Sequence, residues 1–440
     1  MIFDIYISKV ALEDTNRETR RSISIVIAAF FLTFTGCGLN FAFGVYQELY
    51  ETIGGPFASA TPATIDLIGT LAVSLMTMGA PLSSAWTKTY GPRNVTLAGG
   101  LILGLANVLA SFGQKLWHFI LTQGLLLGIG TCFSYMPAVT IAPGWFDARR
   151  GLAMGLVLSG TGIGGVVWAP LLRYLNTVIG FRNTLRLTGG LGFVIISICA
   201  LALRWDPDSE QRIKVELGSR GRHRVRIPLV NWQIAKSRKF FAHACGALLH
   251  SAAYYTPVYF FSAYARTLGY SSATGANFIA ASNASSAGGK ILLGYAADRL
   301  GRLNTLLLCT LVAAMTALGL WLPSTLFDGS QAGKALFITF AITYGIFAGA
   351  YVSLFPTSLV ELFGAQHFAS VNGFLYMIRG IGTLFGTPLA GTFIHHSAGF
   401  MGTAVGYEKA SIMVGVFLFV ATIAVGVARF ESAGLTRLKA

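Results

Sequence analysis

The sequence has few charged residues for its length. Asp, Glu, Lys and Arg make up only 11% of the 440 residues, whereas 54% are hydrophobic, and the mean hydropathy is +0.64. A soluble domain of this size has no core large enough to bury so much apolar material. The composition therefore excludes an ordinary soluble protein and indicates that the lipid bilayer surrounds the chain.

Acidic residues are the scarcer of the charged types. The chain has 17 Asp and Glu against 32 Lys and Arg, which gives a net charge of +15. In a soluble protein such an excess would suggest binding to nucleic acid. Here the basic residues fall in the gaps between apolar runs instead of along one face of a domain, so we expect no nucleic-acid partner.

The sequence also lacks the patterns that hold metals, nucleotides or catalytic groups. Its five cysteines are scattered singly, without CxxC or Cys/His spacing, which argues against a disulfide framework or a zinc site. It has no Walker loop, nucleotide fingerprint, paired catalytic carboxylates or nucleophile elbow. We therefore expect no metal, no cofactor and no catalytic residues, and we predict that the protein is not an enzyme.

Long apolar runs are abundant. About 20 helical residues cross the hydrocarbon core of a bilayer, and twelve runs of that length can be placed between residues 23 and 429. Most of the lysines and arginines then fall in gaps on one side, as the positive-inside rule requires. We predict an all-α, multi-pass integral membrane protein with twelve transmembrane helices, located in the plasma membrane with both termini in the cytoplasm.

Two similar turns divide the chain. The segments GAPLSSAWTKTYGPRN (79–94) and GGKILLGYAADRLGRLN (288–304) place the turn glycines Gly91 and Gly301 210 residues apart, close to half of the chain. A repeat of that period indicates two pseudo-symmetric six-helix bundles, as in many secondary transporters. The predicted parts are a tail (1–22), an N-terminal bundle (23–204), a basic cytoplasmic linker (205–239), a C-terminal bundle (240–429) and a second tail (430–440).

The predicted linker is strongly basic. Such a cluster is either a solvated segment held near anionic lipid headgroups or a site for a partner, and the sequence does not identify an accessory membrane subunit. Its basic residues are Arg212, Lys214, Arg220, Arg222, Arg224, Arg226, Lys236, Arg238 and Lys239.

Small residues recur four positions apart inside the apolar runs. Such pairs let two helix backbones approach closely, in static bundles as well as in moving ones. We expect helix contacts at Gly151/Gly155, Gly160/Gly164, Ser285/Gly289, Gly345/Gly349 and Gly382/Gly386.

Three basic residues lie deep inside predicted spans: Lys290, Arg379 and His250. Lys290 precedes the turn residue Asp298 by eight positions, or about 12 Å of helix. A buried cation costs at least about 2.5 to 3.5 kcal/mol at a helix centre, and the acidic residues inside the spans all lie near span ends. We therefore expect a small-molecule substrate, anionic or carboxylated, to supply the counter-ion.

We assign predicted roles to five of these buried polar residues. Lys290 and Arg379 are predicted to bind the substrate, although either could instead bond only helix carbonyls or water. Asn40 and Tyr351 are predicted to add polar contacts, with core packing as the alternative. His250 is a candidate for carrying a coupling proton because histidine changes charge near physiological pH, or else it is a hydrogen-bonded core histidine.

The second turn resembles a family signature. GYAADRLGR, from Gly294 to Arg302, resembles the GxxxDRxGR loop of the major facilitator superfamily, found there between the second and third and between the eighth and ninth helices. The first turn has Lys88 and Thr89 at the positions of the Asp and Arg. The resemblance implies a gate whose intact part lies in the second half, with the gating residues Gly91, Arg93, Gly294, Asp298, Arg299, Gly301 and Arg302.

Other segments resemble the monocarboxylate transporter family, especially its fungal branch. These are WFxxRRxLAxGxxxSGxxxG (145–164), LNFAFGVYQ (39–47), NASSAGGKILLGYAADRLGRLN (283–304) and YGIFAGAYVSLFP (344–356). Where the family has an Asp and an Arg in its eighth span, this chain has Ser286 and Lys290. The positive charge is kept and the carboxylate is not, which argues against lactate-type transport as in animal members.

These observations predict a transmembrane transporter, secondary active or facilitative, that moves a small organic anion or a secondary metabolite by alternating access. The alternative is a transport-incompetent membrane receptor that senses a small carboxylate.

Overall fold

The computed structural model describes residues 2–51, 62–146, 148–218, 230–327, 330–395 and 403–433, and its secondary structure there is helical. The first half contains α1 (Ile2–Phe41), α2 (Phe43–Glu51), α3 (Pro62–Met78), α4 (Ala80–Tyr90), α5 (Pro92–Ala110), α6 (Leu116–Phe119), η1 (Ile120–Leu126), α7 (Leu127–Ile141), η2 (Ala142–Trp145), α8 (Arg150–Val178) and α9 (Phe181–Ala202). The connection contains α10 (Pro207–Gly218) and α11 (Trp232–Ala235). The second half contains α12 (Arg238–Thr267), α13 (Ser272–Leu300), α14 (Arg302–Thr316), η3 (Ala317–Trp321), α15 (Leu322–Leu326), α16 (Gln331–Phe363), α17 (Ala365–His395), η5 (Ala404–Tyr407) and α18 (Glu408–Ala433).

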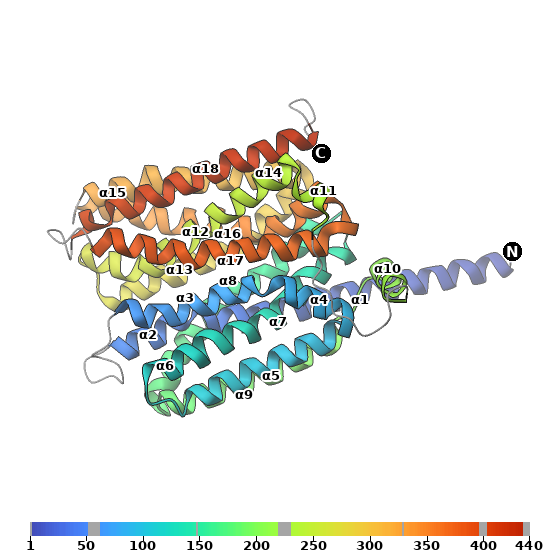
Figure 1. Ribbon diagram of the computed structural model, residues 1–440, viewed down its shortest axis with the longest axis horizontal. Coiled ribbons are helices and arrows are strands. Elements are labelled where there is room, and N and C mark those ends of the chain that lie inside the picture. Colours follow the sequence, from blue (N-terminus) through green and yellow to red (C-terminus); the bar gives the residue numbers. More distant parts are fainter. Residues whose placement is uncertain are drawn as a thin grey trace.

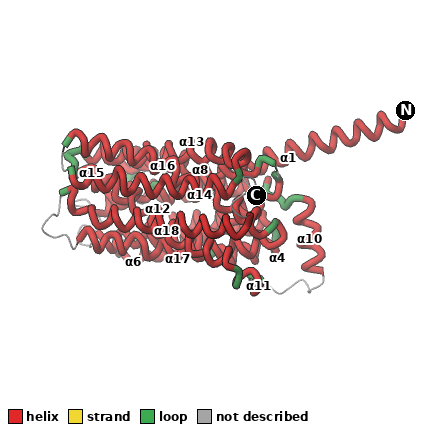
Figure 2. Tube along the Cα trace, turned by 90° about the horizontal axis from the view of Figure 1, so that it is seen from above, coloured by secondary structure: helices red, strands yellow, loops and turns green. Residues whose placement is uncertain are grey.

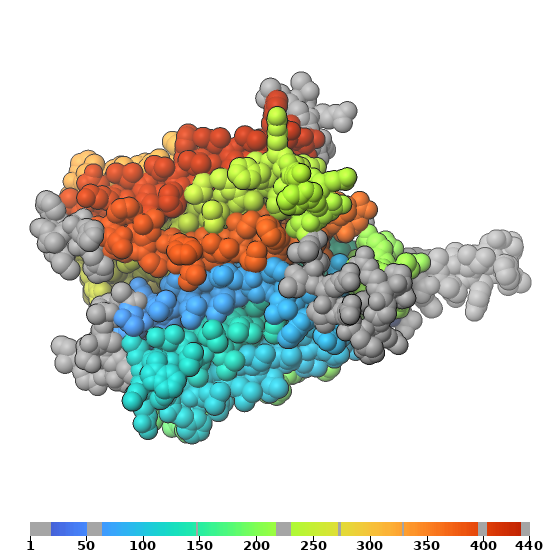
Figure 3. Space-filling view, viewed as in Figure 1, coloured from blue at the N-terminus to red at the C-terminus, as the bar shows by residue number. Residues whose placement is uncertain are grey.

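The helices of each half form one bundle, and the two bundles lie side by side (Figure 1). The halves meet along two helix pairings: α8 packs against α13, and α17 packs against α3 and α4. Seen from above, the first part of α1 extends beyond the bundles at the end where α10 and α11 also lie (Figure 2). On the face drawn in Figure 3, the orange surface of α17 lies directly against the blue surface of α3 and α4.

Every predicted span coincides with a helix or with a consecutive series of helices. Among the described residues, eight helices are long and apolar enough to cross a membrane, and the pair α3 and α4, bent by 48°, makes a ninth. The remaining predicted spans are α12, α13 and α17, which are about 30 residues long but more polar. The multi-pass membrane architecture is therefore supported, while the count of twelve crossings stays a prediction.

The predicted tails and linker contain helices where the structure describes them. The tail at 1–22 continues into the first span as one helix, α1, and the linker contains α10 and α11. The segment 219–229, with four of the nine linker cations, lies outside the described residues, as does the end of the second tail after Ala433.

Glycines allow the close helix contacts that were predicted from the small-residue pairs. A methyl group at Gly294 would lie 2.5 Å from the carbonyl oxygen of Gly151, and one at Gly155 would overlap the carbonyl oxygen of Lys290. Gly349 lies against the side chain of Ser286 on α13, whereas Gly160 and Gly164 lie equally close to the backbone of α1, Gly345 to that of α13, and Gly382 and Gly386 to that of α12. Because backbone lies directly against backbone at these points, a larger residue would separate the helices.

Candidate functional site

The three predicted spans outside those nine, α12, α13 and α17, carry the three deep basic residues. His250 lies on α12, Lys290 on α13 and Arg379 on α17. Each side chain is at least 96% buried. The polarity of these helices therefore has a local cause, since their interior faces carry ionisable and hydroxyl groups that lipid could not solvate.

Lys290 joins the two halves. Its ammonium Nζ donates a hydrogen bond of 2.6 Å to the hydroxyl of Thr161 on α8, and its side chain is 2% exposed. The glycines of α8 make this possible, because Gly155 lets the backbone of α13 approach at Lys290. None of the ion pairs found among the described residues involves Lys290.

Arg379 lies in an aromatic cage in the second half. Its Nε donates a hydrogen bond of 3.1 Å to the hydroxyl of Ser251 on α12. The guanidinium carbon lies 4.9 Å from the ring centres of Phe355 and Tyr376 and 5.9 Å from that of Tyr351. Cation–π contacts stabilise a desolvated guanidinium, but Nη1 has no hydrogen-bond partner and no acid among the described residues pairs with this group.

His250 and Tyr351 are brought together, as part of the same cluster. Their rings are stacked with centres 3.5 Å apart and planes 15° from parallel. Both ring nitrogens of His250 and the hydroxyl of Tyr351 are buried without a hydrogen-bond partner among the described residues. Buried polar atoms of this kind carry a desolvation cost of about 1–3 kcal/mol each, so they are candidates for contact with a ligand or water.

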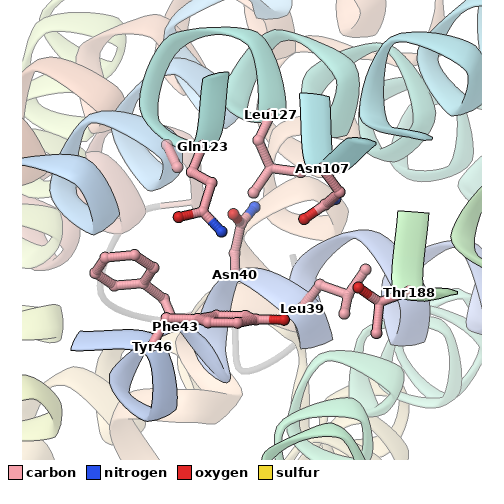
Figure 4. Close-up of a pocket in the computed structure, with 9 residues that line it drawn as sticks. Leu39, Asn40, Phe43, Tyr46, Asn107, Gln123, Leu127 and Thr188 are labelled. Atoms are coloured by element: carbon pink, nitrogen blue, oxygen red, sulfur yellow. The ribbon is translucent and has the colours of Figure 1, made fainter. Parts of the chain in front are cut away.

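Asn40 lies apart from this cluster, in a narrow cavity of the first half (Figure 4). Its Nδ2 donates a hydrogen bond of 3.2 Å to Thr131, while its Oδ1 has no partner among the described residues. The cavity has room for about one water molecule and its polar lining is neutral, being made of Asn40, Tyr46, Asn107, Gln123 and Thr188 beside four apolar residues. Gln123 belongs to η1, and π-helical turns of this kind are frequent at functional sites.

Asp298, near the end of α13, joins the two halves through hydrogen bonds. Its carboxylate accepts hydrogen bonds of 2.8 and 2.9 Å from the backbone N–H groups of Gly151 and Leu152, in the first turn of α8. It also accepts a bond of 3.3 Å from Arg302. An anion at a helix N-terminus meets unsatisfied N–H groups and the positive end of the helix dipole. We call Asp298, Arg302 and the first turn of α8 the inter-half latch.

The other predicted gating residues lie near the two turns but have different contacts. Gly301 and Gly91 have φ of +95° and +84°, so both turns require a residue without a side chain. Arg299 is exposed and lies 4.6 Å over the ring of Tyr295. Arg93 is half-buried, and its Nε has no hydrogen-bond partner among the described residues.

His243, a second fully buried histidine on α12, was not among the residues predicted from the sequence. It precedes His250 by seven residues, which is two helical turns and therefore the same helix face. Its Nε2 lies 3.4 Å from the hydroxyl of Ser358, and its ring is stacked on Phe355. The seven-residue spacing of two histidines inside one apolar run was the signal that could have identified it.

The comparisons with known proteins agree on one family. The family model of the Major Facilitator Superfamily matches residues 25–387. The Agnestins efflux protein AgnL12 of Paecilomyces divaricatus is 26% identical over 413 residues, covering 94% of this chain and 88% of that protein. Monocarboxylate transporter 11 of Homo sapiens is 28% identical over 359 residues, covering 80% of this chain and 73% of that protein.

Solved structures show the same fold. A double tryptophan mutant of XylE superimposes with a TM-score of 0.73 at 11% identity, covering 91% of this chain and 94% of that one. The proton:xylose symporter XylE bound to 6-bromo-6-deoxy-D-glucose gives a TM-score of 0.68 at 12% identity, with 92% and 95% covered. The chain is therefore a transporter and not an enzyme, and it belongs to the major facilitator superfamily.

Proposed function

We propose that the protein moves a small organic anion, such as a carboxylated or aromatic secondary metabolite, by alternating access of its two bundles. The observation that carries this proposal is the pair of buried cations, Lys290 and Arg379, neither of which is paired with an acid among the described residues. A buried charge without a counter-ion is costly. An anionic substrate that enters between the bundles would supply the missing charge.

The surroundings of Arg379 favour a substrate with an apolar or aromatic body. Three aromatic rings face the guanidinium, and the stacked pair of His250 and Tyr351 lies beside them. A carboxylate could accept from the unpartnered Nη1 while a ring packs on this aromatic surface. The relatives support the same range of substrates, since one is named an efflux protein for agnestins and another a monocarboxylate transporter.

Rocking of the bundles requires contacts that open and re-form at the inner end. The inter-half latch consists of short hydrogen bonds to the end of one helix, so it can separate without repacking a core. The glycine contacts between α8 and α13 leave few side chains to interlock along the same seam. We assign the latch to the closed state of the inner gate. The proposed orientation, with both termini in the cytoplasm of a plasma-membrane protein, rests on the distribution of basic residues.

The alternative of a receptor that does not transport gains no support from these relatives, whose names describe transporters and an efflux protein. No observation in the structure favours it.

The test is a flux experiment with purified protein in liposomes. We expect radiolabelled benzoate or a related aromatic acid to enter faster than xylose, and we expect Lys290→Gln to lower that flux at least tenfold, because a charge-assisted bond of about 1.5–3 kcal/mol is lost. The matched control is Lys409→Gln, at the exposed outer end of α18. Unchanged flux in Lys290→Gln, with equal amounts of protein in the liposomes, would refute the role of Lys290.

A further inference from the structure

A pocket at the inner end of the second half lies away from the buried cations. It is formed where α11 and the start of α12 meet the end of α16 and the start of α17, and Figure 3 shows the light-green surface of α11 beside the orange surface of α17 at this end. Its volume is about 280 Å³, close to the lower limit of about 300–1,000 Å³ for small-molecule sites. Its polar lining consists of Gln233, Ser237, Lys239 and His367, beside three apolar residues.

Lys239 supplies the charge of this pocket. Its ammonium donates a hydrogen bond of 2.9 Å to the carbonyl oxygen of Leu362, in the last turn of α16, and lies 5.3 Å from the ring centre of Phe363. An ammonium has three N–H donors, and the bond to Leu362 uses one of them. The amide of Gln233 and the imidazole of His367 are further donors in the lining. Such a set of donors suits the oxygens of an anion such as a phosphate.

The residues before Lys239 add two more cations. Lys236 and Arg238 are both exposed. The ammonium of Lys236 lies 5.0 Å over the ring of Trp232, and Arg238 pairs with Glu431 at 3.8 Å. Because this ion pair is long and exposed, water screens most of its attraction. The surroundings of the pocket are therefore positive.

The carboxylate nearest in sequence to the lining does not offset this charge. Glu361 directly precedes the lining residue Leu362, and its carboxylate interacts with Arg302 and Arg429. No carboxylate belongs to the lining of the pocket as the described residues form it. An anionic ligand would therefore meet attraction there from Lys239 and its basic neighbours.

Two exposed aromatic residues flank the pocket along the chain. Trp232, at the start of α11, is 70% exposed, and Phe241, in the first turn of α12, is 75% exposed. Exposed rings at the end of a membrane-spanning helix are typical of the boundary between headgroups and acyl chains. A soluble anion would leave both rings uncovered, whereas a lipid has acyl chains that cover them. The combination of cations and exposed rings favours a lipid as the ligand.

We propose that this pocket binds the phosphate of an anionic phospholipid from the inner leaflet of the membrane. The ammonium of Lys239 binds a phosphate oxygen, and the acyl chains extend along the exposed ring of Phe241. A headgroup with net negative charge is preferred, because the cations of this segment repel the positive group of phosphatidylcholine. The bound lipid links the connecting segment, through α11, to the ends of α16 and α17. This site is independent of the transported substrate.

The test uses the full-length protein in vesicles with brominated phospholipids, which quench tryptophan fluorescence on contact. The chain has seven tryptophans, so the signal of Trp232 is the difference between the wild type and Trp232→Phe. Titration with brominated phosphatidylserine and brominated phosphatidylcholine gives the preference of the site for the anionic lipid. We expect Lys239→Gln to lower this preference about fivefold, because one basic residue near anionic lipid contributes about that factor. Lys239→Arg should keep the preference, since the charge remains.

Two controls separate the pocket from general electrostatic attraction and from soluble phosphate. Arg212→Gln, on the exposed surface of α10, removes the same charge from the connecting segment outside the pocket, and the preference should change by less than about twofold. Excess inorganic phosphate, compared with chloride at the same ionic strength, should leave the quenching by phosphatidylserine unchanged.

Four results would overturn the lipid site. They are equal quenching of the wild type by the two lipids, a wild-type preference in Lys239→Gln, an equal loss in Arg212→Gln, and displacement by inorganic phosphate, which would identify a soluble ligand. If Lys239→Gln does not fold, His367→Ala takes its place, because it removes the other ionisable group of the lining. An unchanged preference in that variant would then overturn the proposal.

Discussion

The two halves contain turns with the same sequence pattern, but one equivalent position carries a negative charge in the second half and a positive charge in the first. In the second half Asp298 reaches the first turn of α8 and bonds two backbone N–H groups of the other half. In the first half the equivalent position is Lys88, whose ammonium lies 3.8 Å from Glu216 of α10, on the connecting segment. A lysine could not bind the positive end of a helix. Among the bonds found in the described residues, Asp298 of the second turn therefore joins the two halves, whereas Lys88 of the first turn pairs with the connecting segment.

A second difference concerns the interiors of the halves. The polar spans α12, α13 and α17, with their buried basic residues, all belong to the second half. The cavity of the first half is lined by neutral amides and hydroxyls instead. The second half therefore carries these three deeply buried basic residues, whereas the lining of the cavity in the first half is neutral. Four predictions, ordered from the largest expected effect to the smallest, test this asymmetry.

Removing the guanidinium of Arg379 should have the largest effect on transport. We expect Arg379→Gln to reduce benzoate flux in liposomes at least tenfold, since an ionic hydrogen bond of about 1.5–3 kcal/mol is lost. Arg379→Lys should keep part of the flux, because the charge remains but the planar fork does not. The control is Arg266→Gln, at the exposed outer end of α12. Equal flux in the two glutamine variants would show that charge in the second half does not select the substrate.

Adding a methyl group to the seam between the halves should destabilise the protein. Gly155→Ala places that methyl group against the carbonyl of Lys290, and overpacking of this kind costs about 1–3 kcal/mol. Gly190→Ala is the matched control, because Gly190 lies inside α9 with no atom within 4 Å of the added methyl. We expect thermal unfolding in detergent to shift downwards for the first variant and not for the second. A shift of equal size and sign in both would contradict direct backbone contact between α8 and α13.

Neutralising the latch should shift the equilibrium between the gate states. Asp298→Asn keeps the size of the side chain and loses its charge, so we expect the closed inner gate to lose about 1 kcal/mol, or roughly fivefold in population. Distances between spin labels at the exposed positions Arg149 and Arg299 would report this shift. Lys88→Gln should leave the distances unchanged, because a partly exposed and long ion pair such as Lys88 with Glu216, at 3.8 Å, contributes only about 0–1 kcal/mol. A larger change of the label distances in Lys88→Gln than in Asp298→Asn would show that the first turn, and not the second, holds the inner gate closed.

The neutral cavity should have a smaller effect on flux than Arg379. Asn40→Ala removes one amide that bonds Thr131, and we expect benzoate flux to change by less than about tenfold, because a neutral hydrogen bond contributes about 0.5–1.5 kcal/mol. The measurement is the same liposome uptake, compared with Arg379→Gln. A loss as large as that of the arginine variant would place an essential substrate contact in the first half.

Properties that depend on local sequence were predictable. Apolar length and the spacing of small residues depend on one helix at a time, so the positions of the helices and the glycine contacts were predicted correctly, while the count of twelve crossings stays a prediction. The turn glycines were also identifiable, since a positive φ leaves glycine as the residue without strain. The burial of Lys290 and Arg379 followed from their depth in the spans, while their role in binding stays a prediction.

Contacts between distant helices were not predictable from one sequence. Nothing near Asp298 in the chain indicates that its partners are the N–H groups of Gly151 and Leu152, because that pairing depends on how two bundles dock. The aromatic cage of Arg379 likewise combines residues of α16 and α17 with Ser251 of α12. The burial of His243 could not be predicted from its depth, because it lies only about one helical turn from the beginning of its predicted span.

The glycine seam between α8 and α13 also limits how chimeric carriers can be assembled. Gly151 and Gly155 on one side lie against Gly294 and the backbone of Lys290 on the other, so each bundle is shaped to a partner that has no side chains there. A hybrid that joins this second bundle to the first bundle of a relative should assemble only when the donor also has glycine at the two matching positions.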